Sequence, residues 1–528
     1  MSTENPYAGH VVSNKNDSVT TGSKVYTLVS LIVLGIGLLM ALVGFGKEIM
    51  MSMKDYKPFA GMADSAWVGL QHLRALMESS EFMHVVGNTI TFNLKFAGLV
   101  FVLGALAGYA LHVLPSKVRQ GVVLLGALIV FVPASVYSHW WMYVLGSEPF
   151  LQESVMSILH PLLSALKYAG IPIAIIFAAG EGRSRRDAWL PVKGAGLFAL
   201  SSLAFMGSGL FSMTFLLSNP VTMGSTDVLD TYILRSGLMQ ANFSSSAAAN
   251  VLQMLLSAVS LLLLFIPLRL LYKVTFRGER ELEKTVGYAG RAITAAVVFA
   301  LFTIIYFLPY WVEGGSFEPL PAQGWPSFGS SILLYFLISL AGAIPAVVIA
   351  MAMAGAFRSK QKIIVWSASI ALSIITLLTI QPFKISNYMT IREMGMLNTL
   401  FAVVTVTSFS AAAVWAVAAV LRLEAKLSIL TLLSVAGGML LLQTALNYGN
   451  FVPSYLYITD THRSPVMMFM QMTRSAEIIS QSGEAVMRTI GGLYGYWIAL
   501  PPLLLYVAAH MFLPKRQLLL ILSGGFKK

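Results

Sequence analysis

The sequence contains no cysteine and little charge. Of its 528 residues, 11% are Asp, Glu, Lys or Arg and 57% are hydrophobic, whereas soluble domains carry about 25% charged residues. The missing cysteines exclude disulfides, Cys-ligated zinc, iron–sulfur clusters and thiol catalysis. The sequence also lacks a Walker A motif, a nucleophile elbow, a metal-ligand set and paired catalytic carboxylates, so we expect no catalytic residue and no metal site. The composition predicts an integral membrane protein.

The charge that is present is mostly basic, with a net value of +12, and lies in short segments between apolar runs. An Arg or Lys costs about 3 kcal/mol at the centre of a bilayer, so these segments are predicted outside the hydrocarbon, on the cytoplasmic side. No basic patch with interleaved aromatic residues points to nucleic acid. The first 24 residues are polar, without a signal-type apolar core, and we expect a cytoplasmic tail there.

Apolar runs of about 20 residues predict an all-α polytopic membrane protein with about twelve transmembrane helices. The expected spans are Val25–Phe45, Gly87–Leu111, Gly121–Tyr143, Met156–Ala179, Ala195–Leu217, Ala248–Tyr272, Ala292–Val312, Ser331–Ala356, Ile363–Ile380, Leu397–Leu421, Leu427–Leu446 and Gly491–Phe512. The expected division is a tail (1–24), a first transmembrane domain (25–272), a cytoplasmic linker (273–291), a second transmembrane domain (292–512) and a tail (513–528).

The short basic turns all fall on one face of this arrangement, which places both termini in the cytoplasm. Six spans in each half give the halves the same orientation, so they form a parallel pseudo-repeat. A weak sequence similarity between the halves supports the repeat. GNTITF at Gly87–Phe92 and GSSILL at Gly329–Leu334 each begin a span that ends in a basic turn.

Two segments of the first half resemble carbohydrate ABC importer permeases of the oligosaccharide and aldouronate branch. The first, Lys54–Ile90, is similar to the pattern F-K-D-Y-N-P-F-x-G, W-V-G-L-x-x-F and F-x-x-x-x-x-N-T-L of these permeases. The second, Ser218–Ala248, is similar to their last outer loop. The resemblance implies a permease-like fold for residues 25–272.

The second half resembles the partner permease of the same heterodimer. Ile391–Val403 is like its G-L-x-N-T-x-W segment, Tyr448–Ile458 is like W-N-S-W-F-P-A-L-I-Y, and Ser523–Lys527 is close to its C-terminal G-S-V-K-G. The chain therefore looks like two permease subunits fused head to tail. Since both subunits begin and end in the cytoplasm, the linker need not cross the membrane.

The resemblance implies that Phe177–Ala195 couples the permease to an ATPase. Without the resemblance, this segment would be interpreted as an ordinary basic loop on the cytoplasmic side. In the family this is the EAA loop, E-A-A-x-x-x-G-x(9)-I-x-L-P, which docks on a cytoplasmic ATPase. Here the Gly spacing survives but Glu-Ala-Ala is absent, and Leu190–Pro191 lies four residues early, which a short deletion would explain. The second loop is only Arg422–Leu427. The residues expected to couple to the ATPase are Glu181, Gly182, Arg183, Arg185, Arg186, Asp187, Glu424 and Lys426.

Two further groups of residues are candidates for the solute path and for outer contacts. The path candidates are Asn88, Asn93, Lys95, Trp140 and Trp141, and the outer-loop or binding-protein candidates are Asp227, Asp230, Tyr232, Arg235, Asn450 and Tyr455. Each has an alternative interpretation. The charged outer-loop residues can instead pin the loop, Lys95 can snorkel to a headgroup, and the tryptophans can form an interfacial belt.

Three functions from different classes fit the sequence. The resemblance implies the permease component of a carbohydrate ABC importer in a bacterial plasma membrane. Its partners would be a cytoplasmic ATPase dimer that carries ATP and Mg, an extracytoplasmic solute-binding lipoprotein, the carbohydrate and membrane lipid. A secondary carrier would need buried titratable residues or broken helices. A membrane enzyme of lipid or glycan assembly would need catalytic acids in outer loops, and Glu148 and Glu153 are the only close acidic pair near aromatic residues. A divergent permease with weakened ATPase coupling is a further alternative.

Overall fold

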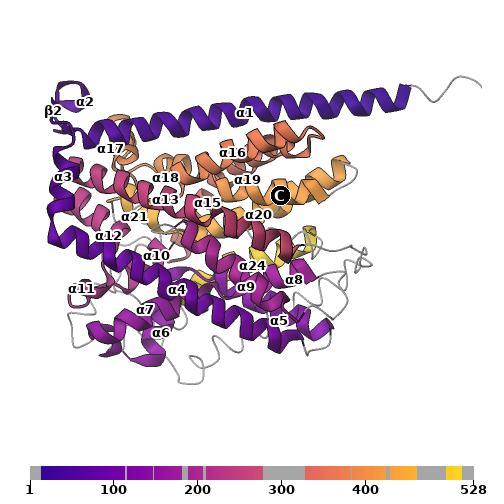
Figure 1. Cartoon of the computed structure of the whole chain (residues 1–528), viewed down its shortest axis with the longest axis horizontal. Coiled ribbons are helices and arrows are strands. Elements are labelled where there is room, and N and C mark those ends of the chain that lie inside the picture. Colours follow the sequence, from indigo (N-terminus) through magenta and orange to yellow (C-terminus); the bar gives the residue numbers. More distant parts are fainter. Residues whose placement is uncertain are drawn as a thin grey trace, which may run out of the picture.

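A computed structural model describes residues 14–112, 116–146, 148–180, 188–205, 210–276, 328–381, 383–423, 428–460 and 495–513. In this part of the chain, long helices lie side by side, and a two-stranded hairpin of β1 and β2 stands at one end (Figure 1). The hairpin pairs Lys54 with Trp67 in antiparallel register. The expected all-α membrane fold is confirmed in this coarse form.

The described elements up to residue 276 alternate long helices with short ones. They are α1 (Asn14–Ser52), β1 (Lys54–Asp55), α2 (Gly61–Asp64), β2 (Ala66–Trp67), α3 (Gln71–Glu78), α4 (Ser80–His112), α5 (Ser116–Phe131), α6 (Ala134–Leu145), the 3-10 turn η1 (Glu148–Leu151), α7 (Glu153–Tyr168), α8 (Gly170–Gly180), α9 (Leu190–Ala204), α10 (Phe211–Leu217), α11 (Met223–Thr226), α12 (Leu229–Leu234), the π-turn η2 (Arg235–Met239) and α13 (Phe243–Thr275).

The described elements from residue 328 onward are again long and short helices. They are α15 (Phe328–Ala354), the 3-10 turn η3 (Gly355–Arg358), α16 (Lys362–Thr379), α17 (Ile385–Glu393), α18 (Leu400–Thr407), α19 (Ala411–Leu423), α20 (Ile429–Gly449), α21 (Val452–Tyr457) and α24 (Gly495–Phe512).

Seven helices of the described part are long and apolar enough to cross a membrane, and two bent pairs bring the number to nine. The seven comprise α1, α4, α7 continued by α8, α13, α15, α16 and α20. The expected span Ala292–Val312 lies outside the described residues. The expected span Ala195–Leu217 is divided between α9 and the short α10. The twelve-span, two-half arrangement therefore stays a prediction.

One expected span, Gly121–Tyr143, is broken. Its two parts, α5 and α6, meet at an angle of 98°. The cause is local, because Pro133 has no N–H to continue the helix and its ψ of 139° is extended. The residue before a proline is also disfavoured in the α conformation, which ends α5 near Val132. The run Leu397–Leu421 is likewise divided into α18 and α19, at 42°. The first break shapes the cavity described below.

The first helix packs on helices that lie more than 300 residues later in the chain. Figure 1 shows α1 running along α16 at one edge of the molecule. The Tyr26 hydroxyl donates to the Met351 carbonyl oxygen at 2.6 Å, and Lys47 Nζ donates to Thr390 Oγ1 at 3.3 Å. Residues from the two sides of the linker therefore contact each other directly.

Candidate functional site

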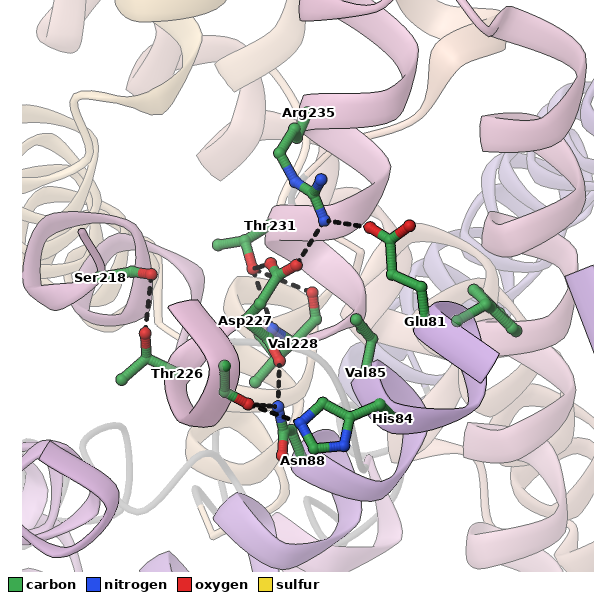
Figure 2. A network of polar contacts seen from close by, with 12 residues as sticks. Glu81, His84, Val85, Asn88, Ser218, Thr226, Asp227, Val228, Thr231 and Arg235 are labelled. Carbon is green, nitrogen blue, oxygen red and sulfur yellow. Dashed lines mark hydrogen bonds and ion pairs between the residues drawn. The ribbon is translucent and has the colours of Figure 1, made fainter. Parts of the chain in front are cut away.

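The loop that joins α10 to α13 is held against α4 by a cluster of polar contacts (Figure 2). At its centre is Asp227, which is 5% exposed. Arg235 Nη2 donates to Asp227 Oδ2 at 2.7 Å and to Glu81 Oε1 at 3.1 Å. Thr231 Oγ1 donates to Asp227 Oδ1 at 2.6 Å. The carboxylate therefore accepts from two donors and holds the loop to the start of α4 through Arg235.

The electrostatics of this cluster favour the pinning role. Burial raises the pKa of Asp227, while the Thr231 hydroxyl and the Arg235 guanidinium oppose that rise. For Arg235, burial acts to lower the pKa, but Asp227 and Glu81 outweigh it and the pKa is raised. Arg235 also lies 5.5 Å from the ring of Tyr232. Of the two interpretations of these charged residues, their contacts support the structural one.

Side chains of α4 fix the other side of the same loop. Asn88 Nδ2 donates to the carbonyl oxygens of Gly224, at 2.8 Å, and Asp227, at 3.2 Å. His84 Nε2 lies 2.7 Å from the same Gly224 oxygen, and the Leu229 N–H donates to Thr89 Oγ1 at 2.9 Å. Asn88 was expected on the solute path, and the structure places it here, holding the loop.

A second set of polar side chains is buried where α1, α12 and α13 meet the start of α17 and the segment before it. We call it the buried polar layer and define it by Glu48, Asp230, Asn250, Gln253, Gln381 and Ser386. Asn250 Nδ2 and the Ser386 N–H both donate to the Glu48 carboxylate, at 2.8 and 2.9 Å. Gln381 Nε2 donates to the Asn250 carbonyl oxygen at 3.2 Å. The layer thus joins elements from both sides of the linker.

Asp230 ends this layer on the α12 side. Gln253 Nε2 donates to Asp230 Oδ1 at 2.7 Å. Burial raises the pKa of Asp230 to about 7, and the hydrogen bond from Gln253 opposes the rise only in part. Asp230 was expected to contact a binding protein, but it is buried and turned toward α13. The sequence pattern did not single out Glu48, although an acid close to the end of a long apolar run is a usable signal.

A cavity of 310 Å³ lies between elements from the two sides of the linker. Its lining residues are Val130, Phe131, Val132, Ala134, Lys167, Tyr168, Phe211, Ser212, Ile380, Ala445, Leu446, Gly449, Asn450 and Val452. They come from the α5–α6 break, α7, α10, the end of α16, α20 and α21. The volume is at the lower end of the range of small-molecule pockets. The mostly apolar wall with a few polar groups is typical of such sites.

Lys167 is the charged residue of this lining, and its side chain is 3% exposed. Its ammonium group donates to the carbonyl oxygens of Ile129, Val130 and Val132 at 3.3, 3.4 and 2.5 Å. These carbonyls belong to the last turn of α5 and to Val132 just beyond it. Pro133 offers no N–H to the Ile129 oxygen, which accepts instead from the Val132 N–H at 3.2 Å. The carbonyls at the α5–α6 break thus hold Lys167 at the cavity.

The other path candidates lie outside this lining. Asn93 is buried and donates to the Thr89 carbonyl oxygen of its own helix at 2.8 Å. Lys95 is exposed on α4 and donates to the Ser157 carbonyl oxygen of α7 at 2.9 Å. Trp140 and Trp141 meet edge to face, 4.9 Å apart, and pack against the core. The structure does not bring these residues together.

The remaining outer-loop candidates are separated as well. Asn450 lines the cavity and accepts a hydrogen bond from the Tyr335 hydroxyl on its backbone oxygen at 2.7 Å. Tyr455 packs on Phe215 at 5.0 Å, and Tyr232 packs on Phe82 at 5.3 Å. Asn450 is therefore the candidate of this group that lines the cavity.

The predicted ATPase coupling residues lie outside the described residues. These are Glu181, Gly182, Arg183, Arg185, Arg186, Asp187, Glu424 and Lys426. Within the described residues, no group of three or more His, Asp or Glu side chains is placed to hold a metal ion.

Comparison with known proteins finds relatives that match about two fifths of this chain. No family model matches the chain. It is 23% identical to Protein LplB of Bacillus subtilis (strain 168), over 41% of this chain and 79% of that protein. It is 26% identical to the polygalacturonan/rhamnogalacturonan transport system permease protein YteP of the same organism, over 43% of this chain and 81% of YteP.

Two solved structures are also similar to the chain. One is a bacterial ABC transporter involved in the import of the acidic polysaccharide alginate, with a TM-score of 0.34 and 20% identity over 42% of this chain and 87% of that chain. The other is an alginate ABC transporter in complex with an alginate pentasaccharide-bound periplasmic protein, with a TM-score of 0.34 and 19% identity over 50% of this chain and 96% of that chain. Together with the apolar helices, the sequence relatives indicate a multi-pass membrane protein similar to transport permeases.

Proposed function

We propose that this chain is the transmembrane permease component of an ABC importer for carbohydrate. The observation that carries the proposal is the similarity to YteP, a polygalacturonan/rhamnogalacturonan transport permease, over most of the length of that protein. A cavity between elements from the two sides of the linker supports it, because a permease needs a central solute site. The chain would sit in a bacterial plasma membrane with both termini in the cytoplasm.

The chain supplies two permease units, residues 25–272 and 292–512. The match to YteP takes up 43% of this chain and 81% of YteP, so the chain has room for a second unit of similar size. The interlocking of α1 with helices beyond the linker fits a pair of units that need no separate partner subunit.

ATP and Mg belong to a separate cytoplasmic ATPase dimer, and an extracytoplasmic binding protein delivers the carbohydrate. The ATPase would dock on the loop between α8 and α9, where Glu181, Gly182, Arg183, Arg185, Arg186 and Asp187 lie, and more weakly on the loop after α19 with Glu424 and Lys426. The pinned outer loop gives a binding protein a firm surface, because its shape is held by Asp227 and Arg235. The solute would then pass between the two units, through the cavity.

Affinity purification of the chain in a mild detergent tests this function. An ATPase subunit should co-purify, and proteoliposomes with that ATPase and the binding protein should take up carbohydrate only with ATP. Purification without any ATPase, together with ATP-independent uptake, would contradict the proposal.

A secondary carrier is the second candidate, and one observation favours it. Glu48 is fully buried and Asp230 is 6% exposed, and buried titratable groups are what ion coupling uses. Uptake by the pure chain in liposomes under an imposed ion gradient would support the carrier and exclude the importer.

A further inference from the structure

The exposed face of α13 changes from apolar to basic near the end of the helix. Leu262, Ile266, Arg269 and Lys273 follow one another at helical spacings of three or four residues, so they lie on one face. All four side chains are exposed. Because α13 is long and apolar enough to cross a membrane, this face meets lipid. Arg269 and Lys273 therefore lie where the acyl chains of the bilayer give way to headgroups.

The start of α16 adds a third cation and an aromatic ring beside them. Lys362 and Trp366 are exposed and lie one turn apart. The Arg269 guanidinium carbon lies 5.0 Å from the centre of the Trp366 ring. The two helices run antiparallel, because the segment just after α16 donates a hydrogen bond to the backbone near the start of α13. Lys273 and Lys362 thus lie on the same side of this contact. We call these four residues the α13–α16 basic patch.

No acid neutralises the patch within the part of the chain that the structure describes. The ion pairs found there are made by Lys57 and by Arg235. The Trp366 ring holds the Arg269 guanidinium by a cation–π contact, which positions the cation but does not cancel its charge. Arg269 makes no hydrogen bond to any described residue, so its N–H groups stay available. Three positive charges are therefore open to an anion.

The depth of Arg269 distinguishes the patch from an ordinary basic loop. Basic residues that only orient a span lie in the loops beyond its end. Arg269 lies six residues before Thr275, the last residue of α13, which is about 9 Å along the helix axis. A lone arginine at this depth would extend to the membrane surface, whereas this one lies against the ring of a neighbouring helix. A partner with an anionic head and apolar tails fits these surroundings.

We propose that the α13–α16 basic patch binds the headgroup of an anionic phospholipid. The three cations pair with the phosphate oxygens, and the acyl chains lie along the exposed apolar face of Leu262 and Ile266. Basic pockets between transmembrane helices bind anionic headgroups in this way. Since α13 and α16 come from opposite sides of the linker, the lipid joins the two sides at one end of the molecule. Such a site requires only that the chain lies in a bilayer, so it stands independently of the carbohydrate and the ATPase.

Lipid binding to the detergent-purified full chain tests the site. Phosphatidylglycerol and phosphatidylcholine with the same acyl chains are titrated separately, and native mass spectrometry counts the protein that carries a lipid. Wild type should bind phosphatidylglycerol about tenfold more tightly, because basic residues near the membrane surface attract an anionic headgroup, whereas the choline group offsets the charge of its phosphate. This comparison needs no variant, so it does not depend on how a mutant folds.

Variants then assign the preference to the patch. The double variant Arg269→Gln, Lys273→Gln removes two charges but keeps polar side chains, so its preference should fall to about twofold or less. Arg269→Lys keeps the charge and should retain most of the preference. The matched control is Lys47→Gln, because Lys47 is also an exposed cation a few residues inside the end of a span. It lies on α1 beside Thr390, away from the patch, and should behave as wild type.

Several outcomes overturn the proposal. Equal binding of the two lipids by wild type would exclude a site for an anionic headgroup. An unchanged preference in the double variant would place the site elsewhere, and an equal loss in Lys47→Gln would assign the preference to the overall charge of the chain. Displacement of the lipid by millimolar inorganic phosphate would show a site for a free anion instead. None of these outcomes bears on the ATPase co-purification, which decides the proposed function separately.

Discussion

Arg235 and Asp227 show what single residues contribute to the loop between α10 and α13. Replacing Arg235 with Met leaves the buried Asp227 carboxylate without its cation, and breaking a buried pair in this way is strongly destabilising. About a quarter of the Arg235 side chain is exposed, so we expect a loss of about 2–3 kcal/mol, below that of a fully buried pair. Thermal unfolding in detergent measures it.

The double variant Arg235→Met, Asp227→Asn should recover part of this loss, because it removes both charges. Lys57→Met is the matched control, since its pair with Asp55 is exposed on both sides and 3.7 Å long. Such a surface pair contributes about 0–1 kcal/mol. If Lys57→Met cost as much stability as Arg235→Met, the role of Asp227 and Arg235 in holding the loop to α4 would be wrong.

The buried carboxyl of Asp230 predicts a pH dependence with a definite sign. Its pKa is raised by burial from 3.8 to about 7, so the folded state holds a proton that the unfolded state releases in this window. The stability that Asp230 contributes is present below about pH 4 and falls as the pH rises toward 7. A shift of about three pKa units corresponds to at most about 4 kcal/mol.

Asp230→Asn removes this dependence, because the amide stays neutral and can still accept from Gln253. The variant should therefore unfold at a higher temperature than wild type at pH 8, and the difference should shrink at pH 5. Comparing the two proteins at each pH cancels the titration of other groups, Glu48 and Lys384 among them. A variant that is less stable than wild type at pH 8 would contradict a buried, proton-holding Asp230.

Individual charges inside apolar runs could be found in the sequence, but not their surroundings. Lys95 and Lys167 both interrupt an apolar run, and only Lys95 was singled out. The structure places Lys95 on the surface and Lys167 at the cavity. A run of apolar residues shows that a charge lies within a span. Which side of the helix faces the interior depends on tertiary packing, which the run does not encode.

At the scale of helices, α5 and α8 approach each other through two glycines. A Cβ added at Gly170 would lie 2.2 Å from the Gly126 carbonyl oxygen, so the helices would have to separate. We expect Gly170→Ala to destabilise the protein by about 1–3 kcal/mol, as overpacking does. The unfolding temperature in detergent measures the effect.

Gly98→Ala on α4 is the control for this substitution, because nothing lies within 4 Å of the added Cβ. It should leave stability unchanged or raise it slightly, since alanine is the better helix former. A neutral Gly170→Ala would mean that α5 and α8 are not in close contact in the folded protein.

The two predicted coupling loops differ in the room between their flanking helices. α8 ends at Gly180 and α9 begins at Leu190, whereas α19 ends at Leu423 and α20 begins at Ile429. The first loop has room for a docking element, and the second has little. Gly182→Pro or the double change Glu181→Ala, Arg185→Ala should therefore severely reduce ATP-driven uptake, while Glu424→Ala and Lys426→Ala should have little effect.

Uptake by proteoliposomes with normal amounts of each variant measures this asymmetry. Equal and strong losses at both loops would contradict it. No loss at either loop would count against coupling to an ATPase altogether.

The elements were easier to predict where one apolar run makes one helix. The runs at Gly87–Leu111, Ala248–Tyr272 and Ile363–Ile380 lie within or coincide closely with α4, α13 and α16. The run Gly121–Tyr143 contains Pro133, which is the available signal for the break. Hydropathy alone cannot show the 98° bend, because a broken run and a continuous run have the same composition.

At the scale of the whole molecule, the two sides of the linker share one interior. The α1 contacts, the buried polar layer and the cavity each draw residues from both sides. Sequence resemblance alone could suggest a fused pair. It could not show Glu48 accepting from Ser386, since the two residues lie far apart in the chain and meet only through folding.

The stoichiometry of the purified complex tests the central claim, that one chain supplies both permease units of an ABC importer. Native mass spectrometry of the material purified in mild detergent gives the number of copies of each subunit directly. The account predicts one copy of this chain with two ATPase subunits. Two copies of this chain with two ATPase subunits would contradict the fusion, and a chain that carries no ATPase would contradict the importer itself.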